Sequence, residues 1–216
     1  MRGPFEVELS RTARWIELGL LFGVVPALLA AHARALALPF LFVTAWICLV
    51  VLWRDPTFQR DQLWRRERLW TWLRGPLAVA LAACSVLAVG LYLLEPAHLF
   101  DLPRGSPLRW LLLMVLYPVL SVVPQELVFR TFFFHRYGRL LGGPWIATAA
   151  SALAFSWAHV VLLNGLAVVL TLLGGWLFAR TYLRTHSLVA TAVEHAAYGC
   201  LLFTVGLGHW FVTGVP

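Results

Sequence analysis

Long apolar runs alternate along this chain with short segments that carry most of its charge. Seven runs are long enough to cross a membrane as helices, because about 20 apolar residues span the hydrocarbon core. They are rich in Leu, Ala and Val without strict alternation, which favours helices over strands. The predicted spans are Trp15–Ala31, Ala35–Trp53, Gly75–Leu94, Trp110–Leu127, Pro144–Leu162, Leu163–Tyr182 and Leu188–Leu207.

Two places leave the span count open. The fifth and sixth runs are nearly fused, and Leu163–Asn164–Gly165 is the only candidate turn between them, so six or eight crossings are alternatives to seven. The first run is preceded by Arg14, and Ala31-His32-Ala33 resembles a signal-peptide cleavage site. Because six further apolar runs follow, we expect the first run to be retained as a span.

Composition excludes an ordinary soluble protein. The chain is 61% hydrophobic and 12% charged, whereas soluble domains are about a quarter charged. In lipid every backbone polar group must be paired internally, which leaves helices as the spanning elements here. The sequence therefore predicts an all-α, polytopic membrane helix bundle of about seven transmembrane helices, in which residues 1–216 form a single transmembrane domain.

In a membrane protein, the net charge of +7 indicates how the chain is oriented across the bilayer rather than that it binds nucleic acid. All 17 basic residues are arginines, and 14 of them fall in the segments on one side of the predicted spans. Cytoplasmic segments carry such an excess, so we expect a cytoplasmic N-terminus and the lipid bilayer as partner, with no nucleic acid. Residues 54–74 combine six arginines with Trp64, Trp70 and Trp72, which predicts a cytoplasmic interfacial segment containing a helix in the headgroup region.

Ionisable residues inside the predicted spans mark a candidate site, because each costs several kcal/mol at membrane depth. Glu126 and Arg130 are four residues apart, so they share a helix face and can form an ion pair. The preceding Pro124 removes a backbone donor and can kink the helix. The alternative is an ion pair that closes the span at the interface, with Arg130 extended towards headgroups.

Two further clusters lie in later spans. His159 ends the sequence Phe155-Ser156-Trp157-Ala158-His159, and the last span contains Glu194, His195 and Tyr198. Each alone could be a hydrogen bond between packed helices. Together, a carboxylate and two imidazoles could converge for hydrolysis, with one group taking a proton from water and another stabilising the oxyanion.

These residues resemble the ordered motifs of the CAAX-protease and bacteriocin-processing family, also called Abi: Glu-Glu-x-x-x-Arg, Phe-x-x-x-His and His-x-x-x-Asn. The resemblance covers residues 110–208, which we expect to be the catalytic core. It implies a glutamate-dependent intramembrane endopeptidase that cleaves a membrane-anchored protein or peptide. In that scheme Glu126 activates water, His159 assists, His195 lies in the oxyanion site, and Gln125, Arg130 and Tyr198 support them.

The chain departs from these motifs at two positions. Gln125 replaces the first glutamate, so the role of the base must pass to Glu126 or be lost, and Gly199 stands where the motif has Asn. The sequence Pro124–Tyr137 resembles a bacterial branch that carries Gln-Glu, which predicts a bacterial inner-membrane protein. Depth is a further difficulty: Glu126 is expected near the cytoplasmic end of its span and His159 near the outer end of the next.

Other functions remain as alternatives. The two departures suggest a catalytically inactive relative that acts as a binding or immunity protein. No cofactor or metal is expected, but Glu126, His159 and His195 could serve as zinc ligands in a metalloprotease, although no His-Glu-x-x-His helix is present. A small transporter would need inverted repeats, and a serine protease a Gly-x-Ser-x-Gly turn; neither is seen. The sequence does not set an oligomeric state.

Overall fold

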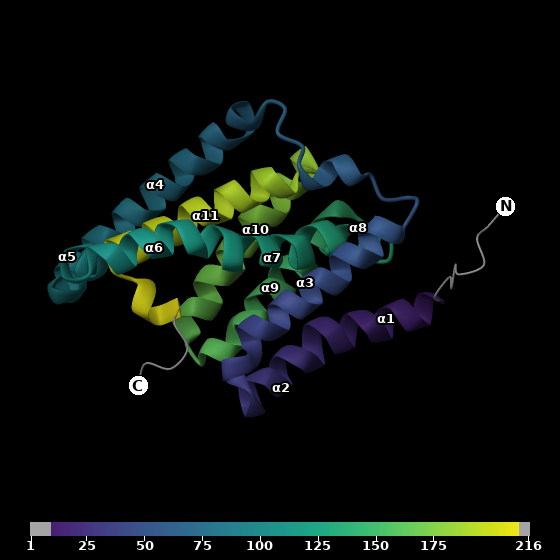
Figure 1. Cartoon of the computed structure of the whole chain (residues 1–216), viewed down its shortest axis with the longest axis horizontal. Coiled ribbons are helices and arrows are strands. Elements are labelled where there is room, and N and C mark those ends of the chain that lie inside the picture. Colours follow the sequence, from purple (N-terminus) through teal and green to yellow (C-terminus); the bar gives the residue numbers. More distant parts are fainter. Residues whose placement is uncertain (1–9, 212–216) are drawn as a thin grey trace.

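The computed structural model describes residues 10–211, and within them every regular element is helical (Figure 1). The α-helices are α1 Arg11–Gly19, α2 Val25–His32, α3 Ala37–Arg54, α4 Leu69–Leu94, α5 Asp101–Gly105, α6 Pro107–Tyr117, α7 Val123–Glu126, α8 Phe133–Tyr137, α9 Pro144–Ala158, α10 Gly165–Thr185 and α11 Leu188–Val205. Three π-helical segments continue them: η1 Leu20–Val24, η5 Pro118–Val122 and η6 Leu127–Phe132. The 3-10 turns are η2 Arg34–Leu36, η3 Arg60–Leu63, η4 Pro96–His98, η7 His159–Leu162 and η8 Gly208–Phe211.

In the described part of the chain, seven continuous helices are long and apolar enough to cross a membrane. They are Arg11–His32, Arg34–Arg54, Leu69–Leu94, Pro107–Tyr137, Pro144–Leu162, Gly165–Thr185 and Leu188–Val205. The prediction of an all-α bundle with seven spans is confirmed. The turn predicted between the fifth and sixth spans is also found, since Leu163 adopts a left-handed conformation (φ 52°) and Asn164 caps α10.

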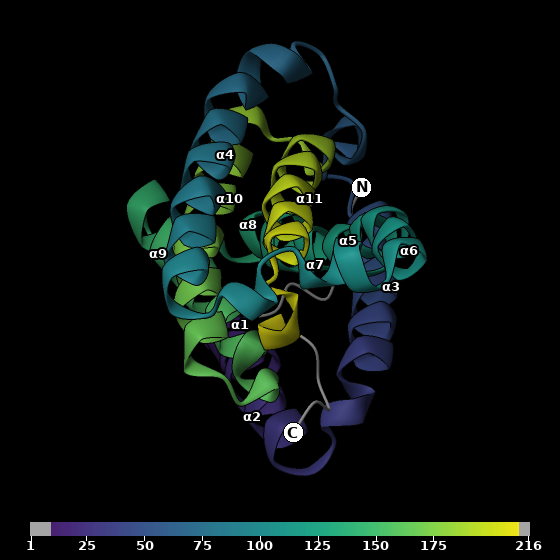
Figure 2. The same ribbon diagram turned by 90° about the vertical axis from the view of Figure 1, so that its left-hand side faces the viewer.

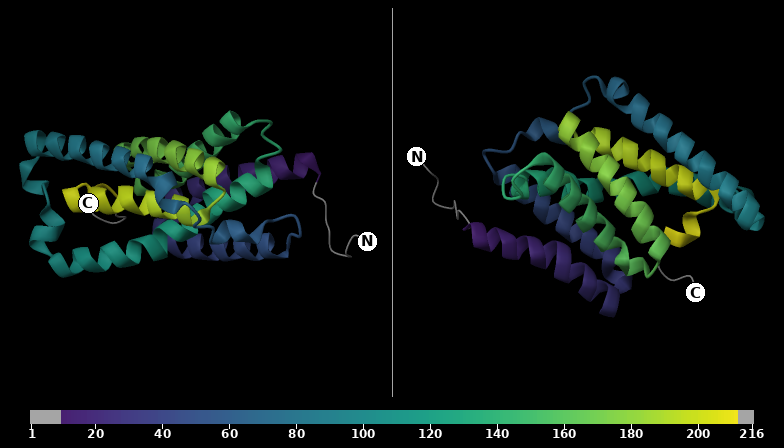
Figure 3. Two further views of the ribbon diagram at one scale, coloured as in Figure 1. Left: turned by 90° about the horizontal axis from the view of Figure 1, so that it is seen from above. Right: turned by 180° about the vertical axis from the view of Figure 1, so that it is seen from behind.

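The late helices form the interior of the bundle. α11 lies between α4 and α6, with α10 beside it (Figures 2 and 3). Half of the most apolar window of α11 is buried, against 11% of that in Arg11–His32. Large apolar side chains such as Trp46, Leu94 and Val115 instead point outwards, as expected where lipid is the solvent. A polar site shielded from lipid is therefore best accommodated around α11.

The arginine-rich segments gather at one end of the bundle. Arg65 donates to the carbonyl of Thr185 (3.4 Å), and Arg136 of α8 forms an ion pair with Glu17 of α1 (2.8 Å). At the same end the Nε2 of His135 lies 2.8 Å from a carboxylate oxygen of Asp55. Burial raises the pKa of Asp55, but its hydrogen bonds to His135 and Thr57 together lower the pKa by more than burial raises it. The pKa of Asp55 therefore lies below its ordinary value. These contacts join segments that alternate crossing must place on the same side.

Two boundary predictions are wrong. Residues 55–68 contain only the short turn η3, and α4 begins at Leu69, six residues before the predicted start at Gly75, so it includes Trp70 and Trp72. The fourth span does not end at Leu127 but continues as a helix to Tyr137. Arg130, which follows the predicted end of the span, is consequently within this helix and fully buried in the bundle.

Candidate active site

The helix around Glu126 is irregular, and its sequence explains why. The short α7 that carries Glu126 stands between two π-helical segments, η5 and η6. Pro118 begins the first and Pro124 follows it, and neither has a backbone N–H to donate to the preceding turn. π-bulges absorb such missing bonds and are frequent at functional sites. The irregularity expected at Pro124 is therefore present, spread over two bulges.

The extended helix places Glu126 well inside the bundle, at a depth that His195 can reach. Glu126 lies 11 residues before the end of its span at Tyr137, which is about 16 Å along a helix at 1.5 Å per residue. His195 lies seven residues after the start of α11, or about 10 Å, measured from the same end of the bundle. Since the helices are inclined to one another (Figure 1), these two levels meet inside the bundle.

Glu126 and Arg130 form a buried ion pair. The Nε of Arg130 lies 3.3 Å from the Oε2 of Glu126, and both side chains are 0% exposed. The guanidinium of Arg130 stacks over the Phe155 ring at 4.2 Å and donates to the carbonyl of Gly175 (3.3 Å). The alternative of an interfacial pair with Arg130 extended to headgroups is therefore wrong. Arg130 instead compensates a carboxylate that has no access to water.

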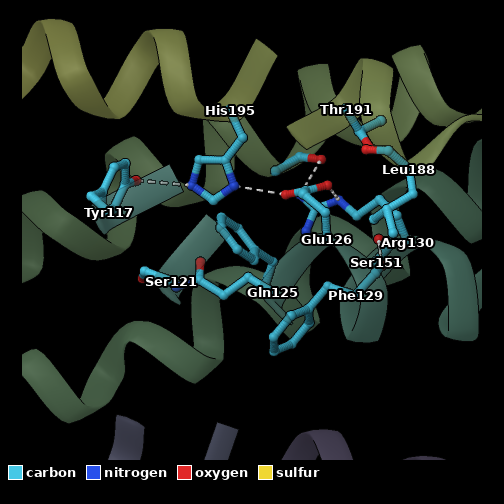
Figure 4. Close-up of polar contacts among 12 residues, drawn as sticks. Tyr117, Ser121, Gln125, Glu126, Phe129, Arg130, Ser151, Leu188, Thr191 and His195 are labelled. Carbon is cyan, nitrogen blue, oxygen red and sulfur yellow. Dashed lines mark hydrogen bonds and ion pairs between the residues drawn. The ribbon is translucent and has the colours of Figure 1, made fainter. Parts of the chain in front are cut away.

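His195 meets the other oxygen of this carboxylate. Its Nδ1 lies 2.7 Å from the Oε1 of Glu126, although the two residues are 69 positions apart in the chain (Figure 4). A carboxylate only accepts hydrogen bonds, so in a neutral imidazole Nδ1 carries the proton and Nε2 keeps a lone pair. The hydroxyl of Tyr117 lies 3.2 Å from this Nε2 and can donate to it. Arg130, Glu126, His195 and Tyr117 thus form one continuous polar chain.

His159 lies beside this chain without direct contact to it among the described interactions. Its Nδ1 donates to the carbonyl of Phe155 (2.7 Å), which again leaves Nε2 unprotonated in the neutral ring. Its ring packs on the Phe155 ring, with 4.6 Å between the ring centroids. The Phe155 ring also contacts the His195 ring, at 5.4 Å between centroids. Glu126 and His195 therefore converge as predicted, and His159 shares their aromatic surroundings.

Gln125 points away from the Glu126 pair. Adjacent helical residues lie about 100° apart, and the Nε2 of Gln125 donates to Ser121 at 2.8 Å. Its Oε1 is buried without a hydrogen-bond partner among the described residues. Figure 4 shows Gln125 and Ser121 on the side of His195 that faces Tyr117. An unpaired buried acceptor beside a polar chain is a place where a bound water would be favourable.

The structure assigns the supporting tyrosine differently from the sequence. Tyr198 was expected beside His195, but its ring packs on Phe178 (5.6 Å), and its hydroxyl has no hydrogen-bond partner within residues 10–211. Tyr117 makes the contact to His195 instead. A signal for Tyr117 existed in the sequence, because Tyr117, Ser121 and Gln125 recur every four residues on an otherwise apolar helix.

A second acid lies close to Arg130. Glu194 is 1% exposed, forms a side-chain hydrogen bond with Thr181 and interacts electrostatically with Arg130. Arg130 therefore interacts electrostatically with carboxylates on two helices. Within residues 10–211, no group of three or more His, Cys, Asp and Glu side chains is arranged to hold a metal ion. The donors present suit proton transfer between a carboxylate, an imidazole and a hydroxyl.

Comparison with known proteins finds one family that is similar to this chain. Residues 107–201 match the model of the family described as type II CAAX prenyl endopeptidase Rce1-like. No curated protein and no solved structure matched the chain. The matched stretch runs from α6 into α11 and contains Glu126, His159 and His195. Over this stretch, somewhat less than half of the chain, the sequence is similar to the CAAX prenyl endopeptidases, which supports the resemblance to the CAAX-protease and bacteriocin-processing family.

Proposed function

We propose that this protein is a glutamic-type intramembrane endopeptidase that hydrolyses a peptide bond in a membrane-anchored protein or peptide. The observation that carries the proposal is the 2.7 Å contact between His195 and Glu126, whose carboxylate is fully buried and paired with Arg130. Burying these charges costs several kcal/mol even when they are paired. Such a cost at membrane depth is typical of a functional site.

Glu126 and His195 act in this proposal as one proton-accepting unit. Once the Tyr117 hydroxyl has turned away from the Nε2 of His195, a water bound there gives its proton to that nitrogen as its oxygen attacks the substrate carbonyl. Glu126 holds the ring by Nδ1 and stabilises the imidazolium that forms, as carboxylates do in other carboxylate–imidazole pairs. His159 offers a second unprotonated Nε2, which can accept the other hydrogen of the water.

This assignment differs from the role in the oxyanion site that the resemblance implies for His195. Donation to an oxyanion through Nε2 needs a proton on that atom, and the bond between Nδ1 and Glu126 leaves Nε2 unprotonated in the neutral ring. His195 is therefore better suited to accept the proton from water. The hydrogen-bond donor to the oxyanion must then be another group.

Cleavage in proteoliposomes tests the proposal. One probe is a farnesylated peptide ending in Cys-Val-Ile-Met, chosen because the matched family is described by CAAX prenyl substrates; the other is a peptide with one apolar transmembrane helix. Each carries a fluorophore and a quencher on opposite sides of the scissile region. We expect wild-type protein to cleave one of them and Glu126→Gln to be 10²–10⁴-fold slower, the usual effect of losing a general base.

Glu95→Gln is the matched control, because it makes the same chemical change at a half-exposed carboxylate outside the spans. It should cleave at the wild-type rate. Equal cleavage by wild type and Glu126→Gln would contradict the proposal. Cleavage of neither probe by wild-type protein would favour the alternative of an inactive relative that acts as a binding or immunity protein.

A further inference from the structure

The side chain missing at position 199 leaves a space that another helix fills. Position 199 lies one helical turn after His195, so a side chain there would lie on the same face of α11. A Cβ built on Gly199 would lie only 2.3 Å from the hydroxyl oxygen of Tyr117 and 2.4 Å from its Cε1. Gly199 is therefore what allows the Tyr117 ring to reach the Nε2 of His195.

Tyr117 is held at this position by packing as well as by its hydroxyl. Its ring meets Phe203 of α11 edge to face at 5.1 Å, and its hydroxyl lies 3.2 Å from His195 (Figure 4). Tyr117 is half-buried, whereas Glu126 is completely buried.

We propose that Tyr117 is the hydrogen-bond donor to the developing oxyanion, an inference that rests on the proposed function. The Tyr117 O–H first turns from Nε2 to the substrate carbonyl oxygen, which frees the lone pair of Nε2. The water O–H bond then breaks and its proton goes to the Nε2 of His195, while the water oxygen bonds to the carbonyl carbon and the π electrons of the carbonyl move to its oxygen. Nε2–H now donates to the Tyr117 oxygen, and the Tyr117 O–H donates to the new oxyanion.

Tyr117→Phe removes only the hydroxyl and keeps the ring that packs on Phe203. We expect kcat on whichever probe is cleaved to fall 10²–10³-fold, as when one oxyanion donor is lost, with KM changed by less than about threefold. Tyr182→Phe is the matched control, because it deletes a buried hydroxyl that bonds to Gln62 (2.8 Å) and has no contact with His195 among the described interactions; it should leave kcat unchanged. Full kcat in Tyr117→Phe, with Glu126→Gln inactive, would overturn the inference while leaving the proposed function standing.

Moving the hydrogen-bond donor from position 117 on α6 to position 199 on α11 tests the donor role independently. Gly199→Asn alone should reduce kcat, because its Cβ displaces Tyr117 from His195. In a Tyr117→Ala background the space is free, and the side-chain amide of Asn at position 199 can donate to the oxyanion in place of the Tyr117 hydroxyl. Tyr117→Ala/Gly199→Asn should therefore be at least tenfold more active than Tyr117→Ala. A double variant no more active than Tyr117→Ala would contradict the inference.

Thermal unfolding tests the steric part without any cleavage assay. Gly199→Ala should lower the Tm of the wild-type protein, because the added Cβ meets Tyr117. The same change should not lower the Tm in a Tyr117→Ala background. An equal effect of Gly199→Ala in both backgrounds would show that Tyr117 does not occupy this space, and would overturn the inference even for a protein that cleaves neither probe.

Discussion

Arg130 is the residue whose replacement most directly tests the energetics of the site. Its guanidinium pairs with Glu126 at 3.3 Å, stacks on Phe155 at 4.2 Å and interacts with Glu194, and it has no exposure to solvent. Arg130→Met keeps an unbranched, flexible side chain of comparable length. It removes the positive charge and leaves the carboxylate of Glu126 buried without its partner.

The expected cost follows from these contacts. Removing one partner of a buried ion pair costs about 3–5 kcal/mol, since the remaining charge stays away from water. Losing the stacking on Phe155 costs up to about 2 kcal/mol for a desolvated pair, and the sulfur of Met on the same ring returns a similar amount at most. A net loss of about 3–5 kcal/mol corresponds to a Tm lower by roughly 6–20 °C for a chain of this size.

The assay is thermal unfolding of purified protein in detergent micelles, followed by circular dichroism. Arg139→Met is the matched control, since Arg139 is exposed and its replacement should stay within about 0.5 kcal/mol of wild type. Glu126→Gln/Arg130→Met should recover part of the loss, because no unpaired carboxylate remains. If Arg130→Met unfolds at the wild-type temperature, or if the two changes are simply additive, Glu126 and Arg130 are not coupled as described.

Three further predictions concern the neighbouring chemistry and the topology. Gln125→Ala should reduce cleavage only moderately, by about 1–2 kcal/mol in the barrier for one lost orienting hydrogen bond, whereas Gln125→Glu should move the pH optimum because two adjacent carboxylates repel; an unchanged pH–rate profile would contradict this. Cleavage should survive strong chelators, and loss that added zinc restores would support the metalloprotease alternative. Reporter fusions at Pro216, which lies outside the described residues, and within residues 54–74 should report opposite sides of the membrane, with the latter cytoplasmic; the same side for both would refute the orientation.

The sequence by itself determined the class of fold and the residues worth examining. Apolar runs of about 20 residues can only be satisfied as membrane helices, so seven spans follow from length and composition. Glu126 and His195 were candidates for the same reason, since ionisable groups at membrane depth are costly unless they have a function. The length of an apolar run and the position of an ionisable residue within it can both be read directly from a single sequence.

Only the tertiary structure decided how these residues meet. The charge of Arg130 made an end of the span at Leu127 plausible, but Glu126, Phe155 and the carbonyl of Gly175 together compensate that charge inside the bundle, so the helix continues to Tyr137. Glu126 lies four residues earlier on the same helix, whereas Phe155 and Gly175 belong to α9 and α10 and reach Arg130 only through packing.

The choice between two tyrosines shows the same limit. Spacing along α11 favoured Tyr198 as the partner of His195, because residues three apart share a helix face. Tyr117 took that place because Gly199 leaves room for a ring from the facing helix. The space beside a glycine is a property of what packs against it, and no spacing rule within one helix contains that information.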